Sequence, residues 1–240
     1  MSGHSKWSTI KRQKEAADQK RGKIFSKLAK EITIAAKEGT DPEKNFKLRL
    51  VIERAKQANM PKENIARAIQ RTQGKLTVGE KIEEVVYEGY APGGVAVIVE
   101  AATDNKNRTT AEIKKIFDRG GGSLTTPGAV SFQFKKAGLI TVEKSDDVQE
   151  QLLTLIDLGA EEVEEAIDAI EVYVKPKAVG EAREKIEKAG FKILTVELVR
   201  QPTTEVKIDQ KEKAERIIKL METLEDHDDV QKVYANFEIV

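Results

Sequence analysis

The fold is decided by residues 137–200, which read AGLI TVEKSDDVQE QLLTLIDLGA EEVEEAIDAI EVYVKPKAVG EAREKIEKAG FKILTVELVR. Short β-branched runs alternate in this stretch with segments in which apolar residues recur at the helical period. The predicted order is strand, helix, strand, strand, helix, strand, which is the ferredoxin-like pattern. The elements are expected at 139–142, 148–158, 161–165, 170–174, 179–189 and 192–199. Residues 137–200 therefore predict a complete α+β unit.

The segment before this unit predicts a sheet that is not finished. Two strands are expected at 85–90 and 95–100, and Pro92-Gly93-Gly94 between them suits a tight turn. A helix follows, capped by Asp104 or Asn107 and ended by Gly120-Gly121-Gly122. Alternation of Val130, Phe132 and Phe134 then predicts a third strand.

The segment after the unit predicts one helix, at 210–224, and one strand, at 230–239. A single helix and strand cannot form a domain, so we expect them to complete the sheet that begins at Val85. This predicts a discontinuous middle domain, residues 80–136 plus 201–240, into which an acidic ferredoxin-like domain, residues 137–200, is inserted.

The first third of the chain predicts helices only. Apolar residues recur at helical spacing from Ile24, and Gly39 is a suitable stop. Asp41-Pro42-Glu43 resembles a second helix start, and Asn59-Met60-Pro61 a third. The overall fold class is therefore α+β with three domains: a basic helical bundle, residues 1–79, followed by two sandwiches of helices on sheets.

The net charge of zero conceals a strong asymmetry. Residues 1–79 contain 19 basic and 8 acidic side chains, whereas residues 137–200 contain 8 basic and 15 acidic ones. The first 30 residues alone hold nine Lys or Arg and two acids. Such a segment attracts a polyanion, because neutralised phosphates release counterions. Trp7 among these cations offers a face on which a base can stack.

We therefore expect nucleic-acid contacts from the basic and aromatic residues of this segment. They are Lys6, Trp7, Lys11, Arg12, Lys14, Lys20, Arg21, Lys23 and Lys27. The ends of the first two strands are candidates for a secondary contact. These residues are Tyr90, Asn105, Asn107 and Arg108, where Arg108 can pair with a phosphate or with Asp104. Tyr87 and Tyr90 lie three residues apart, so one of them is expected in the core.

The composition argues against several other classes of protein. Cysteine is absent, and the two histidines, His4 and His227, have no partner ligands at helical spacing. Asp226-His227-Asp228-Asp229 is interpreted as a solvated turn rather than a cation site. No nucleophile with a base and an orienting group is visible. We expect no enzyme activity, no cofactor, no metal and no small-molecule substrate.

No apolar run approaches the ~20 residues that span a bilayer. The basic start is not followed by the apolar region of a secretory signal, so we expect a cytoplasmic protein without a membrane partner.

Several stretches resemble the YebC/PmpR family. They are His4-Ser5-Lys6-Trp7, Lys20-Arg21-Gly22-Lys23-Ile24-Phe25, Asn59-Met60-Pro61-Lys62, Tyr87-Glu88-Gly89-Tyr90-Ala91-Pro92-Gly93-Gly94 and Thr103-Asp104-Asn105-Lys106-Asn107-Arg108-Thr109. They occur in order over the first half of the chain. Beyond about Gly138 the resemblance is one of architecture and length.

The resemblance leaves the kind of nucleic acid open. The bacterial family implies a DNA-binding transcriptional regulator, but base-reading side chains do not gather on one short helix of the sequence. The mitochondrial relative, a translational activator, implies a ribosome-associated factor that binds ribosomal RNA and relieves stalling at difficult sequences such as proline runs. A third hypothesis is a scaffold that binds proteins through the acidic domain.

Overall fold

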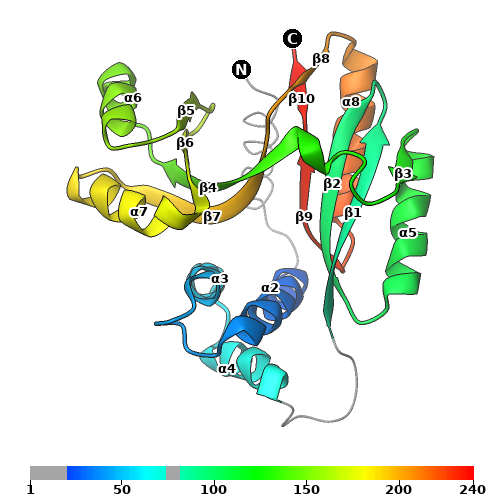
Figure 1. The fold of residues 1–240 in the computed structure, drawn as a ribbon, viewed down its shortest axis with the longest axis horizontal. Coiled ribbons are helices and arrows are strands. Elements are labelled where there is room, and N and C mark those ends of the chain that lie inside the picture. Colours follow the sequence, from blue (N-terminus) through cyan, green and yellow to red (C-terminus); the bar gives the residue numbers. More distant parts are fainter. Residues whose placement is uncertain (1–20, 74–81) are drawn as a thin grey trace. The chain divides into compact units, whose positions relative to one another are not determined.

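Figure 1 shows the computed structural model of the chain, which describes residues 21–73 and 82–240. These residues form two compact units. One comprises the described residues up to Val130 together with 215–233, and the other comprises residues 131–214 and 234–240. The division into domains 1–79, 80–136 plus 201–240, and 137–200 stays a prediction. Within the described ranges, every helix is too short or too polar to cross a membrane.

Helices alone make up the described part of the first third of the chain. They are α2 (Arg21–Ala35), η1 (Ala36–Glu38), α3 (Phe46–Gln57), α4 (Lys62–Gln70) and η2 (Arg71–Gln73). Their apolar faces meet in one core, in which Ile32, Leu48 and Ala55 are fully buried. A helical period in the sequence therefore becomes a helical bundle, because each amphipathic face buries the others.

The second helix begins later than Asp41-Pro42-Glu43, so that expectation is wrong. Asn45 caps α3, with its Oδ1 accepting from the Leu48 amide at 3.0 Å. Its Nδ2 donates to the carbonyls of Ala35 and Gly39, both at 2.7 Å. Asn45 is the better cap because one buried amide satisfies both the start of α3 and the end of the preceding helix.

The first sheet contains β1 (Glu83–Ala91), β2 (Val95–Thr103), β3 (Ser123–Thr125) and β9 (Val230–Ala235), in the order β3-β1-β2-β9. The helices α5 (Lys106–Arg119) and α8 (Lys211–Glu225) accompany it. β9 joins this sheet as an edge strand (Figure 1), so the strand after residue 230 does add to the sheet that β1 begins, as expected.

The expected strand through Val130, Phe132 and Phe134 is wrong. Residues Ser131–Gln133 form the short helix η3, and Phe132 is 74% exposed. The carboxylate of Glu88 accepts the amides of Gly128 and Val130, each at 2.8 Å. Because this side chain already holds the backbone before Ser131, that backbone pairs with no strand there.

The second four-stranded sheet has the order β5-β6-β4-β7 and is antiparallel throughout. Its elements are β4 (Phe134–Val142), α6 (Val148–Asp157), β5 (Glu162–Glu165), β6 (Ile170–Val174), η4 (Pro176–Ala178), α7 (Val179–Lys188) and β7 (Ile193–Pro202). The pattern is ferredoxin-like, as expected. The mixed α+β class, with a helical region followed by sheet domains, is confirmed.

A small two-stranded sheet was not expected. β8 (Val206–Ile208) pairs in parallel with β10 (Phe237–Ile239). The expected strand 230–239 is therefore divided at Asn236, which is fully buried and donates to Gln133 Oε1 at 2.8 Å. The Asn236 carbonyl accepts the Val206 amide at 2.7 Å, which starts the new pairing.

Candidate nucleic-acid interface

Three lysines of α2 point to the end of α8. Lys23, Lys27 and Lys30 are spaced by four and three residues, so they share one helix face. Lys23 Nζ donates to the carbonyl of Asp226, and Lys27 Nζ donates to the carbonyl of Glu225 at 2.5 Å. Cations suit this position, because the last carbonyls of a helix carry partial negative charge.

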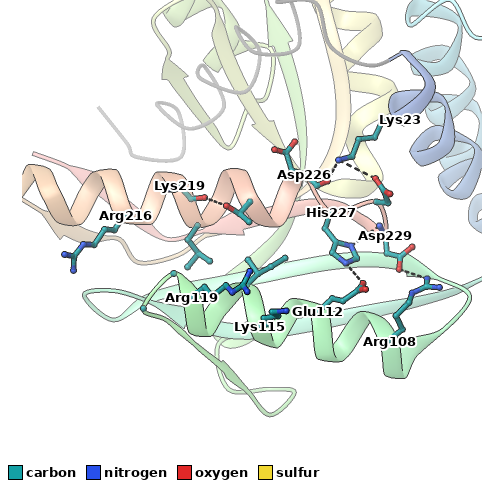
Figure 2. A pocket seen from close by; sticks show the side chains of 16 residues that line it. Lys23, Arg108, Glu112, Lys115, Arg119, Arg216, Lys219, Asp226, His227 and Asp229 are labelled. Atoms are coloured by element: carbon teal, nitrogen blue, oxygen red, sulfur yellow. Dashed lines mark hydrogen bonds and ion pairs between the residues drawn. The ribbon is translucent and has the colours of Figure 1, made fainter.

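These contacts bear on two of the expected nucleic-acid contacts. Lys23 also lies 3.4 Å from the carboxylate of Asp228 (Figure 2). Lys23 and Lys27 therefore have partners within the protein itself. Their part in binding nucleic acid stays a prediction, and the structure adds a role in holding α2 to the end of α8.

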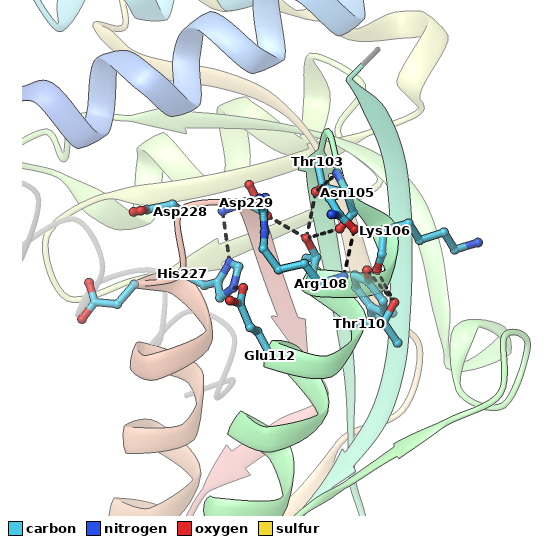
Figure 3. A network of polar contacts seen from close by, with 12 residues as sticks. Thr103, Asn105, Lys106, Arg108, Thr110, Glu112, His227, Asp228 and Asp229 are labelled. Carbon is cyan, nitrogen blue, oxygen red and sulfur yellow. Dashed lines mark hydrogen bonds and ion pairs between the residues drawn. The ribbon is translucent and has the colours of Figure 1, made fainter. Parts of the chain in front are cut away.

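Asp229 is the centre of this contact. The residue is 4% exposed, and its Oδ1 lies 2.5 Å from Lys30 Nζ. Its second oxygen, Oδ2, accepts from Thr109 Oγ1 at 2.7 Å and from Arg108 Nη2 at 3.1 Å (Figure 3). Burial alone would raise the pKa of Asp229, but hydrogen bonds from Lys30, Thr109 and Arg108 outweigh it and hold the pKa well below its usual range.

The candidates for a secondary contact also have partners in the fold. Asn105, rather than Asp104 or Asn107, caps α5 and accepts the Arg108 amide at 3.1 Å. Arg108 pairs with Asp229 at 3.1 Å and with Asp104 at 2.8 Å, and these hydrogen bonds raise the pKa of its guanidinium. Asn107 is exposed. The expected pairing of Arg108 with Asp104 is confirmed, and a contact of these residues with nucleic acid stays a prediction.

The two tyrosines of β1 differ in their surroundings. Tyr87 is the core residue, 6% exposed, with its hydroxyl 3.1 Å from Thr110 Oγ1. Tyr90 is half-buried, and its hydroxyl donates to the Ala129 carbonyl at 3.2 Å. Tyr90 is thus the one of the pair with a face left for a partner.

Most of the expected nucleic-acid contacts lie outside the described residues. They are Lys6, Trp7, Lys11, Arg12, Lys14 and Lys20, together with the side chain of Arg21.

A groove that the sequence did not predict lies between α5 and α8, with a volume of about 1160 Å³ (Figure 2). One end is acidic and is formed by Glu112 and the segment 226–229 around His227. The other end is basic. Four cations line it: Lys115 and Arg119 from α5, and Arg216 and Lys219 from α8. The spacing of each pair was visible in the sequence, but nothing there showed that the two helices lie together.

At the acidic end, Glu112, His227 and Asp229 come close enough for a metal ion, with candidate ligand atoms within 4.8 Å of one another. His227 Nδ1 accepts the Asp229 amide at 3.1 Å, so a neutral ring carries its proton on Nε2. That Nε2 faces Glu112 at 2.8 Å, and Asp229 already accepts from three donors. The geometry is that of a closed polar network. The segment 226–229 was expected to be a solvated turn, and this is wrong for Asp229, which is buried, and for His227, which is half-buried.

Comparison with known proteins gives a consistent result over the whole chain. The model of the TACO1/YebC protein N-terminal domain matches residues 5–75, and that of the TACO1/YebC second and third domain matches residues 82–237. A relative from Dictyoglomus turgidum, named a probable transcriptional regulatory protein, is 51% identical over 100% of this chain and 96% of its own length. One from Geobacter sulfurreducens with the same description is 50% identical over the same shares.

A solved structure agrees with these relatives. The crystal structure of a conserved hypothetical protein from Aquifex aeolicus superposes with a TM-score of 0.85 at 47% sequence identity. The match covers 93% of this chain and 92% of that one.

Proposed function

The chain belongs to the TACO1/YebC family, and from this membership we propose that it is a non-enzymatic regulator of gene expression that binds nucleic acid. The observation that carries the proposal is the charge of the N-terminal third. Residues 1–79 hold 19 basic and 8 acidic side chains. Such a surface attracts a polyanion. Because relatives are named probable transcriptional regulatory proteins, we take nucleic acid as that polyanion.

The helical bundle supports this proposal with cations that are free to bind. Lys56, Arg67 and Arg71 are exposed, and within residues 21–73 and 82–240 they form no ion pair. Arg54 differs, because it pairs with Glu31 at 2.8 Å. The described part of the basic third therefore carries positive charge that its own acidic side chains do not neutralise.

DNA is the first candidate ligand. The relatives' names favour it, and α4 adds a structural observation that the sequence had not suggested. This helix follows α3 after a turn of four residues, and it presents Arg67 and Gln70 on one exposed face. Arg and Gln are side chains that read guanine and adenine in the major groove. Arg67 and Gln70 are therefore the side chains of α4 to which this candidate assigns base contacts.

Ribosomal RNA is the second candidate, and a separate observation favours it. Trp7 is the single tryptophan of the chain and stands among the cations of the N-terminal segment. An aromatic ring beside basic residues suits the unstacked bases of irregular RNA. A regulator that binds the ribosome would affect translation first and transcription indirectly.

Ultraviolet crosslinking in growing cells tests both candidates at once. The tagged chain is crosslinked, and the bound DNA and RNA are both recovered and sequenced. Reads on discrete promoter DNA support the transcriptional role, and reads on ribosomal RNA support the translational one. Recovery of neither above the level of an untagged strain contradicts the proposed function.

A further inference from the structure

We propose that the basic end of the groove between α5 and α8 is a second phosphate-binding surface, which holds the backbone of a nucleic-acid strand. The proposal rests on the proposed function, because it takes nucleic acid as the ligand. Its residues are Lys115, Arg119, Arg216 and Lys219, which we call the groove cations. All four lie outside the N-terminal third to which the sequence assigned the binding.

The geometry of the two helices brings the groove cations together. Lys115 and Arg119 are four residues apart on α5, and Arg216 and Lys219 are three apart on α8. Each spacing puts a pair on one helix face. Both pairs are among the residues that line the groove, one pair from each helix. A strand lying in the groove would therefore meet cations on both sides.

The charge of the groove cations is not used by the fold. Each of the four is exposed, and none forms an ion pair with another described residue. The cations at the other end, Lys23 and Arg108, are paired with Asp228 and with Asp104 and Asp229. Four unpaired like charges in one depression raise the local positive potential and attract anions. A bound phosphate would reduce the repulsion between the pair of cations on α5 and the pair on α8.

The floor of the groove suits a nucleotide chain rather than a free ion. Ile116 and Leu220 contribute apolar surface between the cations. Gly120 allows the end of α5 to lie close to α8, because a Cβ at this position would lie 2.8 Å from Leu220 Cδ1. A strand presents sugar and base surface as well as phosphates, and it fills such a site better than one anion.

The acidic end limits where the strand can lie. Glu112, Asp226 and Asp228 line the groove beyond the groove cations, and they repel phosphate. The backbone is therefore confined to the part between the C-terminal half of α5 and the middle of α8. Because one end of the groove is basic and the other acidic, the strand is expected to occupy the basic end and not the whole length of the groove.

Binding of labelled nucleic acid to matched charge variants tests the proposal. The probes are a fluorescein-labelled single-stranded RNA of mixed sequence and a duplex DNA of the same sequence, and the readout is anisotropy over a salt series. The groove variant is R119E/R216E. The control is K114E/K211E, which makes the same charge change on the same two helices at exposed positions that do not line the groove.

The groove variant is expected to bind at least one probe about tenfold more weakly than the control. Its slope of log affinity against log salt is expected to be smaller by about two, because two phosphate contacts are lost. Equal affinity of the groove variant and the control would overturn the groove proposal and leave the proposed function standing. Failure of the unchanged protein to bind either probe would instead overturn the proposed function.

A neutral variant guards against a folding artefact. K115Q/K219Q removes the other two groove cations without adding a negative charge, and a matching melting temperature shows that it is folded. A loss of affinity in K115Q/K219Q supports the groove proposal even where R119E/R216E is unfolded. Unchanged affinity in K115Q/K219Q together with a folded, unaffected R119E/R216E rejects it.

Discussion

Lys30 Nζ lies 2.5 Å from Oδ1 of Asp229, and this ion pair joins the first described helix to a residue that precedes β9 almost two hundred positions later. The Asp229 carbonyl also accepts the Ala102 amide at 2.7 Å. The carboxylate of Asp229 thus connects α2 with the start of α5, and its backbone carbonyl adds the end of β2. Residues 21–30, the described end of the segment that the sequence presents as a nucleic-acid contact, are therefore also part of the folded structure.

Asp229→Ala should destabilise the protein by about 2–3 kcal/mol. The substitution leaves Thr109 and two cations without their acceptor, but Lys30 and Arg108 keep some access to water, so the loss stays below that of a fully buried pair. Chemical denaturation at neutral pH measures it. Asp228→Ala is the control and should change stability by less than about 0.5 kcal/mol, since its side chain is 82% exposed. Equal effects of the two substitutions would contradict this role of Asp229.

Glu164 should make the protein less stable as pH rises from about 4.5 to 7. Burial, with the nearby charges of Glu171 and Glu162, raises the pKa of Glu164 to about 7 from 4.5. Between these values the folded state binds more protons than the unfolded state, so stability falls as pH increases. Glu164→Gln should flatten this part of the profile, whereas Glu161→Gln, at an exposed neighbour, should not. If the two variants gave the same dependence of stability on pH, protonation of Glu164 would not be coupled to unfolding.

Substitutions of the α2 lysines and of the basic residues before α2 should have different effects. K23A/K27A should lower stability by about 1 kcal/mol, because two cations leave the end of α8. K11A/R12A/K14A, in the N-terminal segment, should weaken nucleic-acid binding with no change in the melting temperature. Thermal melts and anisotropy of the same preparations compare them. A melting temperature lowered by K11A/R12A/K14A would mean that those residues stabilise the fold.

Gly89→Ala should cost about 1–3 kcal/mol through overpacking. A Cβ at Gly89 would lie 2.6 Å from the Ser123 carbonyl oxygen and 2.7 Å from the ring of Phe117, so β1 would move away from β3 and α5. Gly22→Ala makes the opposite prediction, because nothing lies within 4 Å of its Cβ position and alanine favours a helix by about 0.5–1 kcal/mol. Urea unfolding should show a lower free energy of unfolding for Gly89→Ala and a higher one for Gly22→Ala.

The sequence predicted the ferredoxin-like order because each of its elements has a strong period of its own. All four strands of the order β5-β6-β4-β7 lie largely within residues 137–200, and only the ends of β4 and β7 extend beyond them. The same holds for the hairpin of β1 and β2, whose turn residues are local. Family resemblance, carried by the motifs of the first half, was confirmed over the full length.

The errors came from side-chain contacts that a local sequence pattern does not show. Glu88 holds the backbone at Gly128 and Val130, and no local pattern reveals that a strand is prevented there. Asn45 was missed as a cap because its advantage lies in reaching Ala35 and Gly39. The groove escaped prediction for the same reason, since α5 and α8 lie about a hundred residues apart along the chain.

The measurement that tests the central claim most directly is the salt dependence of nucleic-acid binding by the unchanged protein. If the basic third neutralises several phosphates, log affinity should fall linearly with log salt, with a slope of about −0.7 per contact on single strands and −0.9 on duplex DNA. K11A/R12A/K14A should reduce that slope by about two to three. Affinity that does not change with salt, or that the triple substitution leaves intact, would contradict the claim that the basic N-terminal third binds nucleic acid.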